Sequence, residues 1–514
     1  MATRELAPEH LRRTADPAQL GFKSTQELEP LREIIGQPRA VEAVGFGVRI
    51  PGPGYNMYAL GPSGTGRTTT VLRFLERETA GRPVPDDWCY VYNFFAPARP
   101  RALRLPAGRG GQLRRDMDNL IEELRTEIPR AFESEDYERQ KEQIARDVSE
   151  QKQEEFTRLE RYARERGFTL LRTPSGVAIA PLRDGQPLTP EQFSQLDPAT
   201  REHLESEGRQ IQGALNATLR MSRRLDRIAR ERVERLDREV AAFATSPMFD
   251  ELRGAYADFP AVIEYLTAVQ KDVIDNVEMF RLARAAQEAG EMPAALTRLF
   301  APAPSFERYQ VNVLVDNSQT RGAPLIMEPN PTFHNLIGRI EYESRFGALV
   351  TNFTLIKPGA LHRANGGYLV LGVREVLTNP FAWDALKRAL MTRCARVEEM
   401  GQEYRLVVTA TIEPEPIPLD IKVVLIGDPY VYYLLYALDE DFRELFKVKA
   451  DFAVVMDWTD QSAHEYARFI ANVVDEEKLR PFAASGVAKI IEESARMVGD
   501  QRKLATRFGD VIDL

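Results

Sequence analysis

A run of eight residues near the N-terminus has the composition and spacing of a phosphate-binding loop. Residues 61–68 read G-P-S-G-T-G-R-T, which fits the pattern G-x-x-x-x-G-K-[ST] except that Arg67 stands at the lysine position. In such loops, backbone N–H groups at the start of a helix bind phosphate, and the lysine reaches the β- and γ-phosphates. The candidate phosphate-binding residues are Gly61, Gly64, Thr65, Gly66, Arg67 and Thr68.

The sequence on either side of this run supplies the strand and the helix that such a loop needs. Residues 55–60 form an apolar segment typical of a short buried strand, and residues 69–77 have the pattern of a helix. Arg67 keeps the positive charge of the missing lysine, but its guanidinium is planar and bulkier. We therefore expect the backbone part of the loop to survive this exchange and productive hydrolysis to be impaired.

The second half of a nucleotide site, a pair of carboxylates that holds Mg²⁺ and polarises water, is missing from its expected place. The best candidate strand, residues 367–371, runs into Gly372 where the metal-binding acid should stand, and the nearest carboxylate, Glu375, lies off that register. Thr68 could touch a metal, but no partner carboxylate is visible, so no metal site is predicted. Two defects favour a nucleotide site that has lost its activity and requires neither ATP nor Mg²⁺. A simple strand-helix turn is the weaker alternative.

Composition excludes several other classes of protein. The 514 residues carry a net charge of -9 with interspersed acids and bases, which argues against a nucleic-acid surface, although residues 220–238 are locally basic. Cys89 and Cys394 are the two cysteines, a usage typical of a reducing cytosol and without metal-site spacing. No apolar stretch approaches the ~20 residues that span a bilayer, and the N-terminus lacks a signal-peptide pattern. We expect a cytoplasmic protein without membrane or nucleic-acid partners.

Apolar segments near both ends of the chain, with charge-rich helices between them, divide the sequence into five parts. Residues 1–25 are a polar tail, residues 26–107 the first part of an α/β domain, and residues 108–300 a helical insertion. Residues 301–458 return to α/β character, and residues 459–514 form a helical lid subdomain. Besides the strand before the loop, the expected core strands are residues 88–94, 309–315, 367–371 and 421–427.

The helical insertion has the pattern of a coiled-coil arm. Apolar residues recur at steps of three and four in residues 111–167 and again in residues 198–244. Between them, residues 168–181 have the strands and the short turn of a β-hairpin. The apolar positions do not hold one strict heptad register, so the arm is expected to be kinked or bundled. A solvated spacer and an arm that contacts substrate or another subunit are both open interpretations.

Five segments, which follow one another along the second part of the chain, carry a resemblance to a known family. They are residues 358–371, 379–390, 413–420, 441–452 and 506–510. In this order they resemble motifs of the Lon-related AAA+ peptidases, peptidase family S16. The long insertion between two degenerate nucleotide motifs is similar to the LonC-type branch, which is known for working without ATP. The resemblance implies an AAA+-like α/β fold of the P-loop NTPase type, with a parallel sheet and a helical lid.

The resemblance also implies roles for single residues. It maps residues 64–68 onto the phosphate loop and Gly372 onto the lost metal-binding acid. Arg443 maps near the arginine that would reach a neighbouring subunit's nucleotide, and Arg507 onto the sensor arginine of the lid. For both arginines, an ordinary salt bridge is an equally open interpretation.

By the same resemblance, the full-length protein is a Lon-type endopeptidase with a serine nucleophile and a lysine base. Neither motif is present here, so no catalytic residue is predicted in this chain, and the peptidase domain is expected after the lid. The module is expected to form a homo-oligomeric ring, hexameric by analogy, that admits unfolded proteins for degradation and quality control. Because conformational work needs a source of free energy, a ring without hydrolysis can gate but cannot pull.

Two alternatives stay open at this point. In the first, the chain is the active or nucleotide-binding ATPase module of an ATP-dependent Lon protease, in which Arg67 replaces lysine and Glu375 or Asp428 supplies the metal contact. In the second, the chain is a non-enzymatic adaptor that holds partners with its coiled-coil arm and has no attached peptidase.

Overall fold

The chain forms two compact units. The computed structural model describes residues 11–29, 31, 35–173, 176–183, 185–288, 306–345, 348–398 and 412–514, together with Glu5 and Ala7. The first unit combines Met1–Met117 with Glu307–Leu514, and the second contains Asp118–Phe306. A long insertion therefore interrupts the first unit, in agreement with the predicted fold class.

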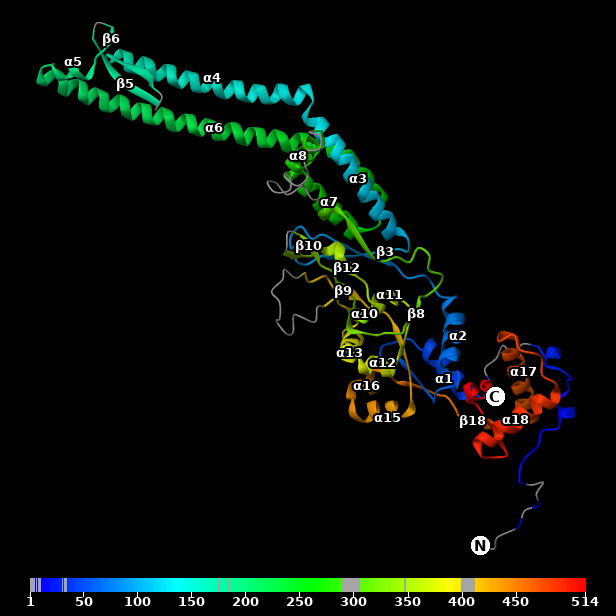
Figure 1. Cartoon of the computed structure of the whole chain (residues 1–514). Coiled ribbons are helices and arrows are strands. Elements are labelled where there is room, and N and C mark those ends of the chain that lie inside the picture. The colour runs from blue at the N-terminus through cyan, green and yellow to red at the C-terminus, as the bar shows by residue number, and fades with distance from the viewer. Residues whose placement is uncertain are drawn as a thin grey trace. The chain divides into compact units, whose positions relative to one another are not determined.

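A five-stranded sheet forms the core of the first unit, in the order β17-β1-β16-β13-β8 (Figure 1). The strands are β17 (Val448–Asp451), β1 (Met57–Leu60), β16 (Lys422–Gly427), β13 (Tyr368–Gly372) and β8 (Leu325–Glu328). All neighbouring strands in this sheet run parallel, which confirms the predicted parallel α/β fold. Because the strands point the same way, their carboxyl ends lie along one edge, where ligands of such sheets bind.

Helices cover both faces of this sheet, which explains why its central strands are almost wholly apolar. α1 (Pro38–Arg49) and α2 (Arg67–Thr79) pack on the face that carries Met57 and Ala59. The other face carries Tyr58 and packs against helices from the second half of the chain. These are α10 (Phe333–Ile337), α11 (Ala360–Arg363), α12 (Val373–Thr378), α13 (Ala382–Thr392), α15 (Pro429–Leu438) and α16 (Glu440–Leu445).

Two of the predicted core strands belong to a different sheet. β2 (Asp87–Val91) and β7 (Val311–Val315) form an antiparallel sheet with β3 (Arg101–Leu105), in the order β3-β2-β7. The prediction that they extend the core sheet was therefore wrong. The short link between β2 and β3 is the physical reason, because only antiparallel neighbours can be joined without a long crossover. The core takes β8 and β17 instead, which are four residues long and include charged side chains.

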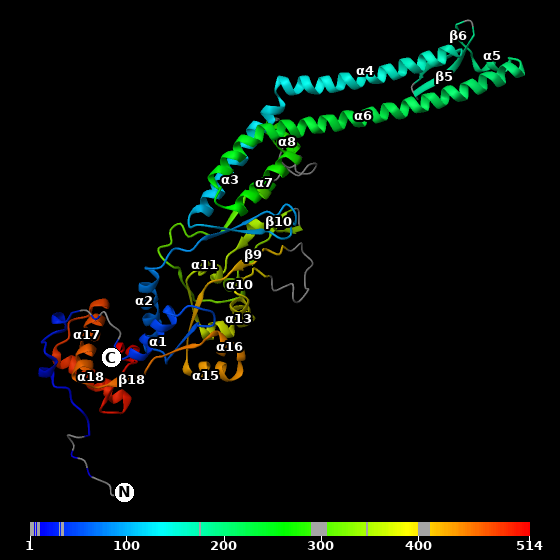
Figure 2. The same ribbon diagram turned by 180° about the vertical axis from the view of Figure 1, so that it is seen from behind.

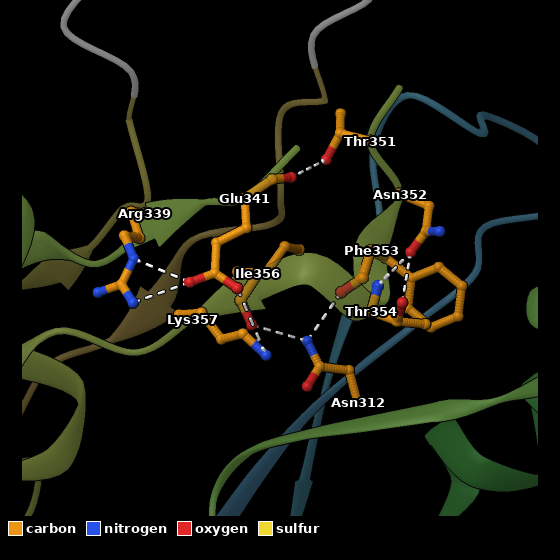
Figure 3. Close-up of polar contacts among 9 residues, drawn as sticks. All are labelled: Asn312, Arg339, Glu341, Thr351, Asn352, Phe353, Thr354, Ile356 and Lys357. Carbon is orange, nitrogen blue, oxygen red and sulfur yellow. Dashed lines mark hydrogen bonds and ion pairs between the residues drawn. The ribbon is translucent and has the colours of Figure 1, made fainter. Parts of the chain in front are cut away.

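A polar cluster holds the segment before β13 against the three-stranded sheet (Figure 3). Asn312 on β7 donates its side-chain amide to the carbonyl oxygens of Phe353 and Ile356, at 2.8 and 3.0 Å. The backbone carbonyl of Glu341 accepts a hydrogen bond from Thr351 at 2.8 Å. The carboxylate of Glu341 has two cationic neighbours, Arg339 and Lys357. Short antiparallel pairs complete this region: β9 (Arg339–Ile340) with β12 (Ile356–Lys357), β10 (Glu343–Arg345) with β11 (Ala348–Val350), and β14 (Cys394–Ala395) with β15 (Ile417–Pro418).

The C-terminal part of the first unit is a helical lid, as predicted. It consists of β18 (Val455–Asp457), α17 (Asp460–Glu476), α18 (Ala484–Val498), β19 (Lys503–Ala505) and α19 (Phe508–Ile512). The sequence predicts a tail for residues 1–25, but two short 3-10 helices, η2 (Pro17–Leu20) and η3 (Thr25–Glu27), accompany the lid. Leu20 and Phe22 are buried in the apolar cluster of α17 and α18. Because most of this segment is polar, little in the sequence indicated that Leu20 and Phe22 would be buried against the lid.

The second unit contains a pair of long helices that lie side by side in both views (Figures 1 and 2). α4 (Glu135–Glu165) and α6 (Pro198–Ala255) run antiparallel, and the hydroxyl of Tyr137 donates to Asp237 between them, at 2.9 Å. The helix predicted for residues 111–167 is interrupted at Ser134, whose side chain caps α4. The residues of α3 (Arg109–Phe132) begin in the first unit and end in the second. The other elements of the second unit are β4 (Phe168–Thr173), β5 (Gly176–Arg183), β6 (Gln186–Pro187), α5 (Pro190–Ser194), α7 (Pro260–Asp275) and α8 (Val277–Glu288). No helix in the described ranges combines the length and the apolar character that a bilayer crossing requires.

A completely buried histidine lies on α11, just before β13. His362 is 1% exposed, and its Nδ1 accepts the N–H of Gly359 at 3.3 Å. Its Nε2 has no hydrogen-bond partner among the described residues. Burial lowers the pKa of His362 to about 4, because the imidazolium would lose its hydration without gaining a counter-charge. The ring is therefore neutral in the folded protein at pH 7.

We expect His362 to make the first unit sensitive to mild acid. Between its unfolded pKa of 6.5 and its folded pKa of about 4, the unfolded state binds the proton and the folded state does not. The free energy of unfolding should therefore fall as the pH drops through this window, by about 3 kcal/mol at pH 4 relative to pH 7.

Urea unfolding at a series of pH values measures this effect. His362→Asn keeps an acceptor for the N–H of Gly359 but cannot be protonated, so its stability should change less with pH than that of the natural chain. His464→Asn, at an exposed position of α17, is the matched control and should keep the natural dependence. Equal slopes for all three proteins would contradict the prediction.

Candidate nucleotide site

The predicted phosphate loop connects β1 to α2 at the carboxyl edge of the parallel sheet. Gly64 and Gly66 have φ angles of 82° and 71°, which only glycine adopts at little cost, and Gly66 is the N-cap of α2. The hydroxyl of Thr65 donates to the carbonyl of Pro62 at 2.9 Å, and the N–H of Gly61 donates to that of Gly427 at 3.3 Å. The loop is thus held by its own bonds and by the end of β16.

Arg67, the first residue of α2, is bonded to the protein itself. Its Nη1 donates to the carbonyl oxygen of Gly427 at 2.7 Å. Burial lowers the pKa of Arg67, whereas the neighbouring Tyr58, Asp428 and Glu375 act in the opposite direction. The guanidinium thus bonds the backbone at the end of β16 and lies near the carboxylates of Asp428 and Glu375.

The end of β13 is occupied by the side chain of a later acid. A Cβ atom at Gly372 would lie 2.0 Å from Oε2 of Glu375, so the carboxylate of Glu375 fills the space beside the backbone of residue 372. An aspartate at position 372 would have to displace it. The structure thus brings Glu375 toward the site, although the sequence places it off the expected register.

Tyr58 and Asp428 complete the surroundings of Arg67. The hydroxyl of Tyr58 donates to the carbonyl of Asp428 at 3.0 Å, and burial raises the pKa of this tyrosine. The carboxylate of Asp428 accepts the N–H of Tyr430 at 2.8 Å and so caps α15. Within the part of the chain that the structure describes, no group of three or more histidine, cysteine, aspartate or glutamate side chains could hold a metal ion.

The lid touches the phosphate loop through backbone atoms. The N–H of Gly509, in α19, donates to the carbonyl of Gly64 at 3.1 Å, and a Cβ atom at position 509 would lie 3.1 Å from Cα of Gly64. Arg507, the predicted sensor, forms an ion pair with Asp510 at 2.8 Å. Arg507 therefore lies two residues from the contact between the lid and the phosphate loop, but its side chain is paired with Asp510 of its own helix.

Arg443, the other predicted arginine, lies on α16. Its Cζ atom is 5.4 Å from the ring centroid of Tyr436, an arrangement that favours a cation over an aromatic face. The structure therefore pairs Arg443 with α15 and gives it no assigned role toward the phosphate loop of the same chain.

Sequence reasoning missed several residues that build the site. Tyr58 looked like an ordinary core residue of β1, and Gly427 like the end of an apolar strand. Their importance depends on the pairing of β1 with β16, which joins residues that are far apart in the sequence. Gly509 gave one usable signal, since a glycine directly after Arg507-Phe508 permits close backbone approach.

Comparison with protein families finds Lon-like domains in several parts of the chain. Residues 87–120 match the Lon-like LonC helical domain, residues 321–453 match the LonB-like AAA domain, and residues 481–514 match the lid domain of archaeal LonB AAA+ ATPases. These matches confirm the predicted resemblance to Lon-related AAA+ proteins. The chain therefore contains a Lon-like AAA domain together with a Lon-like helical domain.

A curated relative points the same way. The putative Lon protease homolog of Escherichia coli (strain K12) is 25% identical over 179 residues, covering 32% of this chain and 28% of that protein. The chain is thus a distant homologue and spans less than a third of the length of this relative. Among solved structures, NtrX from Brucella abortus is 12% identical and covers 47% of this chain and 59% of its own, with a TM-score of 0.21, which is too low to indicate a shared fold.

We expect Arg67→Lys to destabilise the first unit without creating an ATPase. The shorter lysine lacks the guanidinium Nη1 that donates to Gly427, and a hydrogen bond from a charged group typically contributes about 1.5–3 kcal/mol. Residue 372 still lacks the metal-binding carboxylate, so phosphate release from ATP should stay at background. Thermal unfolding and a phosphate-release assay measure both quantities, with Arg73→Lys on the exposed side of α2 as the matched control. A variant that is as stable as the natural chain, or that hydrolyses ATP, would contradict this expectation.

Proposed function

We propose that this chain is the AAA-like module of a Lon-like serine peptidase, and that it works as a passive ring and gate without ATP hydrolysis. The observation that supports this most directly is the bond from Arg67 to the carbonyl of Gly427, at 2.7 Å. A guanidinium held by the end of β16 is not free to follow a transferring phosphoryl group. The Arg67 guanidinium, which stands at the lysine position of the loop, is therefore bonded to the protein backbone instead of being free to bind a phosphate.

The missing acid at Gly372 adds a second, independent defect. Phosphoryl transfer depends on Mg²⁺ to bridge the phosphates and to neutralise the developing charge. The carboxylate of Glu375 lies where a side chain at position 372 would begin, and that of Asp428 caps α15. Neither carboxylate belongs to a group of three or more histidine, cysteine, aspartate or glutamate side chains that could hold a metal ion among the described residues. A bound nucleotide would therefore lack the groups that promote its hydrolysis.

The gating role follows from the loss of the motor. A ligand that is not turned over cannot drive repeated conformational work, so folded substrates cannot be pulled apart. A homo-oligomeric ring, hexameric by analogy with AAA+ relatives, would still restrict entry to unfolded chains. In this proposal the LonC-type branch is the nearest functional parallel, the peptidase residues lie outside this chain, and the full-length enzyme acts in cytoplasmic protein quality control.

A second candidate is an active or nucleotide-binding ATPase module with unusual ligands. One observation favours it: Glu375 and Asp428 both lie near enough to Arg67 to affect its pKa. If these two carboxylates turned toward a metal ion, Thr68 at the start of α2 would be the natural third ligand. This candidate requires Arg67 to leave Gly427.

Calorimetric titration of the chain with ATP and Mg²⁺, followed by a phosphate-release assay, tests the proposed function. We expect no turnover, and either no binding or binding that Thr68→Ala leaves nearly unchanged, because no metal depends on this hydroxyl. A P-loop ATPase of established activity serves as the assay control. Turnover that Thr68→Ala abolishes would support the second candidate and refute the passive gate.

The full-length protein allows the complementary test. Degradation of an unfolded substrate should proceed equally with and without ATP, whereas a stably folded protein should resist in both conditions. Degradation of the folded protein only in the presence of ATP would overturn the proposal.

A further inference from the structure

We propose that the outer edge of β8, with the cleft that adjoins it, binds a short extended segment of an unfolded polypeptide, which adds to the core sheet as one more strand. Two strands, β16 and β13, separate β8 from β1 and the phosphate loop that follows it, so this is a different site. The inference rests on the proposed function only for the kind of occupant, an unfolded protein chain.

The outer edge of β8 is an open sheet edge. β8 is the last strand on its side of the five-stranded sheet, and it pairs with β13 alone. The N–H of Tyr368 on β13 donates to the carbonyl of Pro324 at 2.8 Å, so the backbone groups of Pro324 and, two residues on, Ile326 face β13. In a parallel ladder, the residues between them turn their backbone groups the other way. Those of Leu325 and Met327 therefore point to the outer edge.

These outward groups are unpaired. The N–H and C=O groups of Leu325 and Met327 have no hydrogen-bond partner within the ranges that the structure describes. Met327 is 48% exposed, so solvent reaches this part of the edge. An unpaired row of backbone donors and acceptors is a template for a further strand. A new strand can use these groups without breaking any bond between β8 and β13.

A cleft adjoins this edge and offers apolar contacts to the side chains of an added strand. Its volume is about 580 Å³, within the range of about 300–1,000 Å³ that is typical of ligand pockets. The cleft is lined by Leu325 and Ile326 of β8 and by Leu314 and Val315 of β7, the end strand of the three-stranded sheet. α2 and α11 both contact β8 and also line the cleft (Figure 1).

The open edge selects an extended polypeptide over other macromolecules. The backbone groups along a helix are already bonded to one another, so only an extended chain presents free N–H and C=O groups at the spacing of a strand. At about 3.3 Å per residue, the four residues of β8 match about 13 Å of such a chain.

The charge of the cleft agrees with this choice. Its charged lining residues are two acids, Glu76 and Asp316, and two bases, Arg321 and Arg363. A balanced lining gives no attraction to a polyanion such as a nucleic acid. Because side chains alternate along a strand, an occupant with an apolar residue at every second position would place one row of side chains on the apolar lining.

Such a site would distinguish unfolded chains from folded ones without nucleotide. In a folded protein, apolar strands are paired with their neighbours, and their backbone groups are already satisfied. In an unfolded chain, the same segments are free to pair with β8. Recognition by strand addition therefore gives a passive module a preference for unfolded proteins through binding alone.

Fluorescence anisotropy with a labelled peptide tests the site. The probe is a peptide of alternating valine and threonine, with lysine and glutamate at its ends, titrated with the chain. Met327→Pro removes an outward N–H and places a ring on the edge, while the ladder to β13 keeps its bonds. We expect this variant to bind the probe at least about tenfold more weakly, because one hydrogen bond is lost and the strand cannot approach closely. Met327→Val keeps the N–H and is the matched control, with the affinity of the natural chain.

A second probe separates backbone pairing from nonspecific apolar binding. The same peptide with N-methylated backbone amides keeps its side chains but loses its hydrogen-bond donors, so we expect it to bind at least about tenfold more weakly. Equal binding of the two peptides, equal binding by the proline and valine variants, or no binding by the natural chain overturns the proposal. An oligomer of the natural chain that Met327→Pro dissociates would assign the edge to a second copy and also overturn it.

Hydrogen exchange on the natural chain gives a readout that needs no variant, in case Met327→Pro fails to fold. We expect saturation with the unmodified peptide to slow exchange of the Leu325 and Met327 amides about tenfold and to leave Ile326, which faces β13, unchanged. Unchanged exchange at Leu325 and Met327 contradicts the site. Peptide binding is measured without ATP, so ATP turnover would refute the proposed function and leave this result standing.

Discussion

The burial of a parallel sheet on both faces is the constraint on which the rest of the first unit depends. Helices on either side require apolar strands, and a common strand direction gathers all the carboxyl ends along one edge. Leu60 ends β1, Gly372 ends β13 and Gly427 ends β16, so three distant stretches of sequence meet where the phosphate loop begins. The bond from Arg67 to Gly427 and the position of Glu375 beside Gly372 both depend on this convergence.

At this edge of the sheet, the positive charge of Arg67 is balanced by carboxylates of the protein itself. A half-buried guanidinium is costly unless acceptors surround it, and Arg67 has the carbonyl of Gly427 with the carboxylates of Glu375 and Asp428 nearby. In a working nucleotide site, the same volume would hold phosphate and a metal ion whose charges are supplied from outside. Here the protein supplies both the positive and the negative charges. A phosphate would have to compete with the carbonyl of Gly427 for the guanidinium of Arg67. The bond from Arg67 to Gly427 therefore forms without any bound nucleotide.

The α/β character, the helical insertion and the helical C-terminal part could be predicted from the sequence because apolar runs and helical periodicity are local signals. The parallel sheet and the lid were implied by the family resemblance. The sequence also predicts the phosphate loop, whose glycine spacing is local too. The prediction placed β2 and β7 in the wrong sheet, because the apolar pattern of a strand does not indicate which strand pairs with it. It also missed β17, in which Lys449 and Asp451 interrupt the apolar pattern. The bond from Arg67 to Gly427 and the packing of Leu20 and Phe22 on the lid both join residues that are hundreds of positions apart. Such pairings depend on topology, which no local pattern contains.

The contact between Gly64 and Gly509 limits which residues can stand at these two positions. A left-handed backbone at Gly64, with α19 resting on it, disfavours any side chain whether or not a nucleotide ever binds. The requirement that keeps this glycine is therefore one of backbone conformation and packing. The glycine signature of such a loop can therefore persist for reasons of packing alone, whatever chemistry the loop performs. In this chain the departure from the signature falls at Arg67, outside the contact between Gly64 and Gly509.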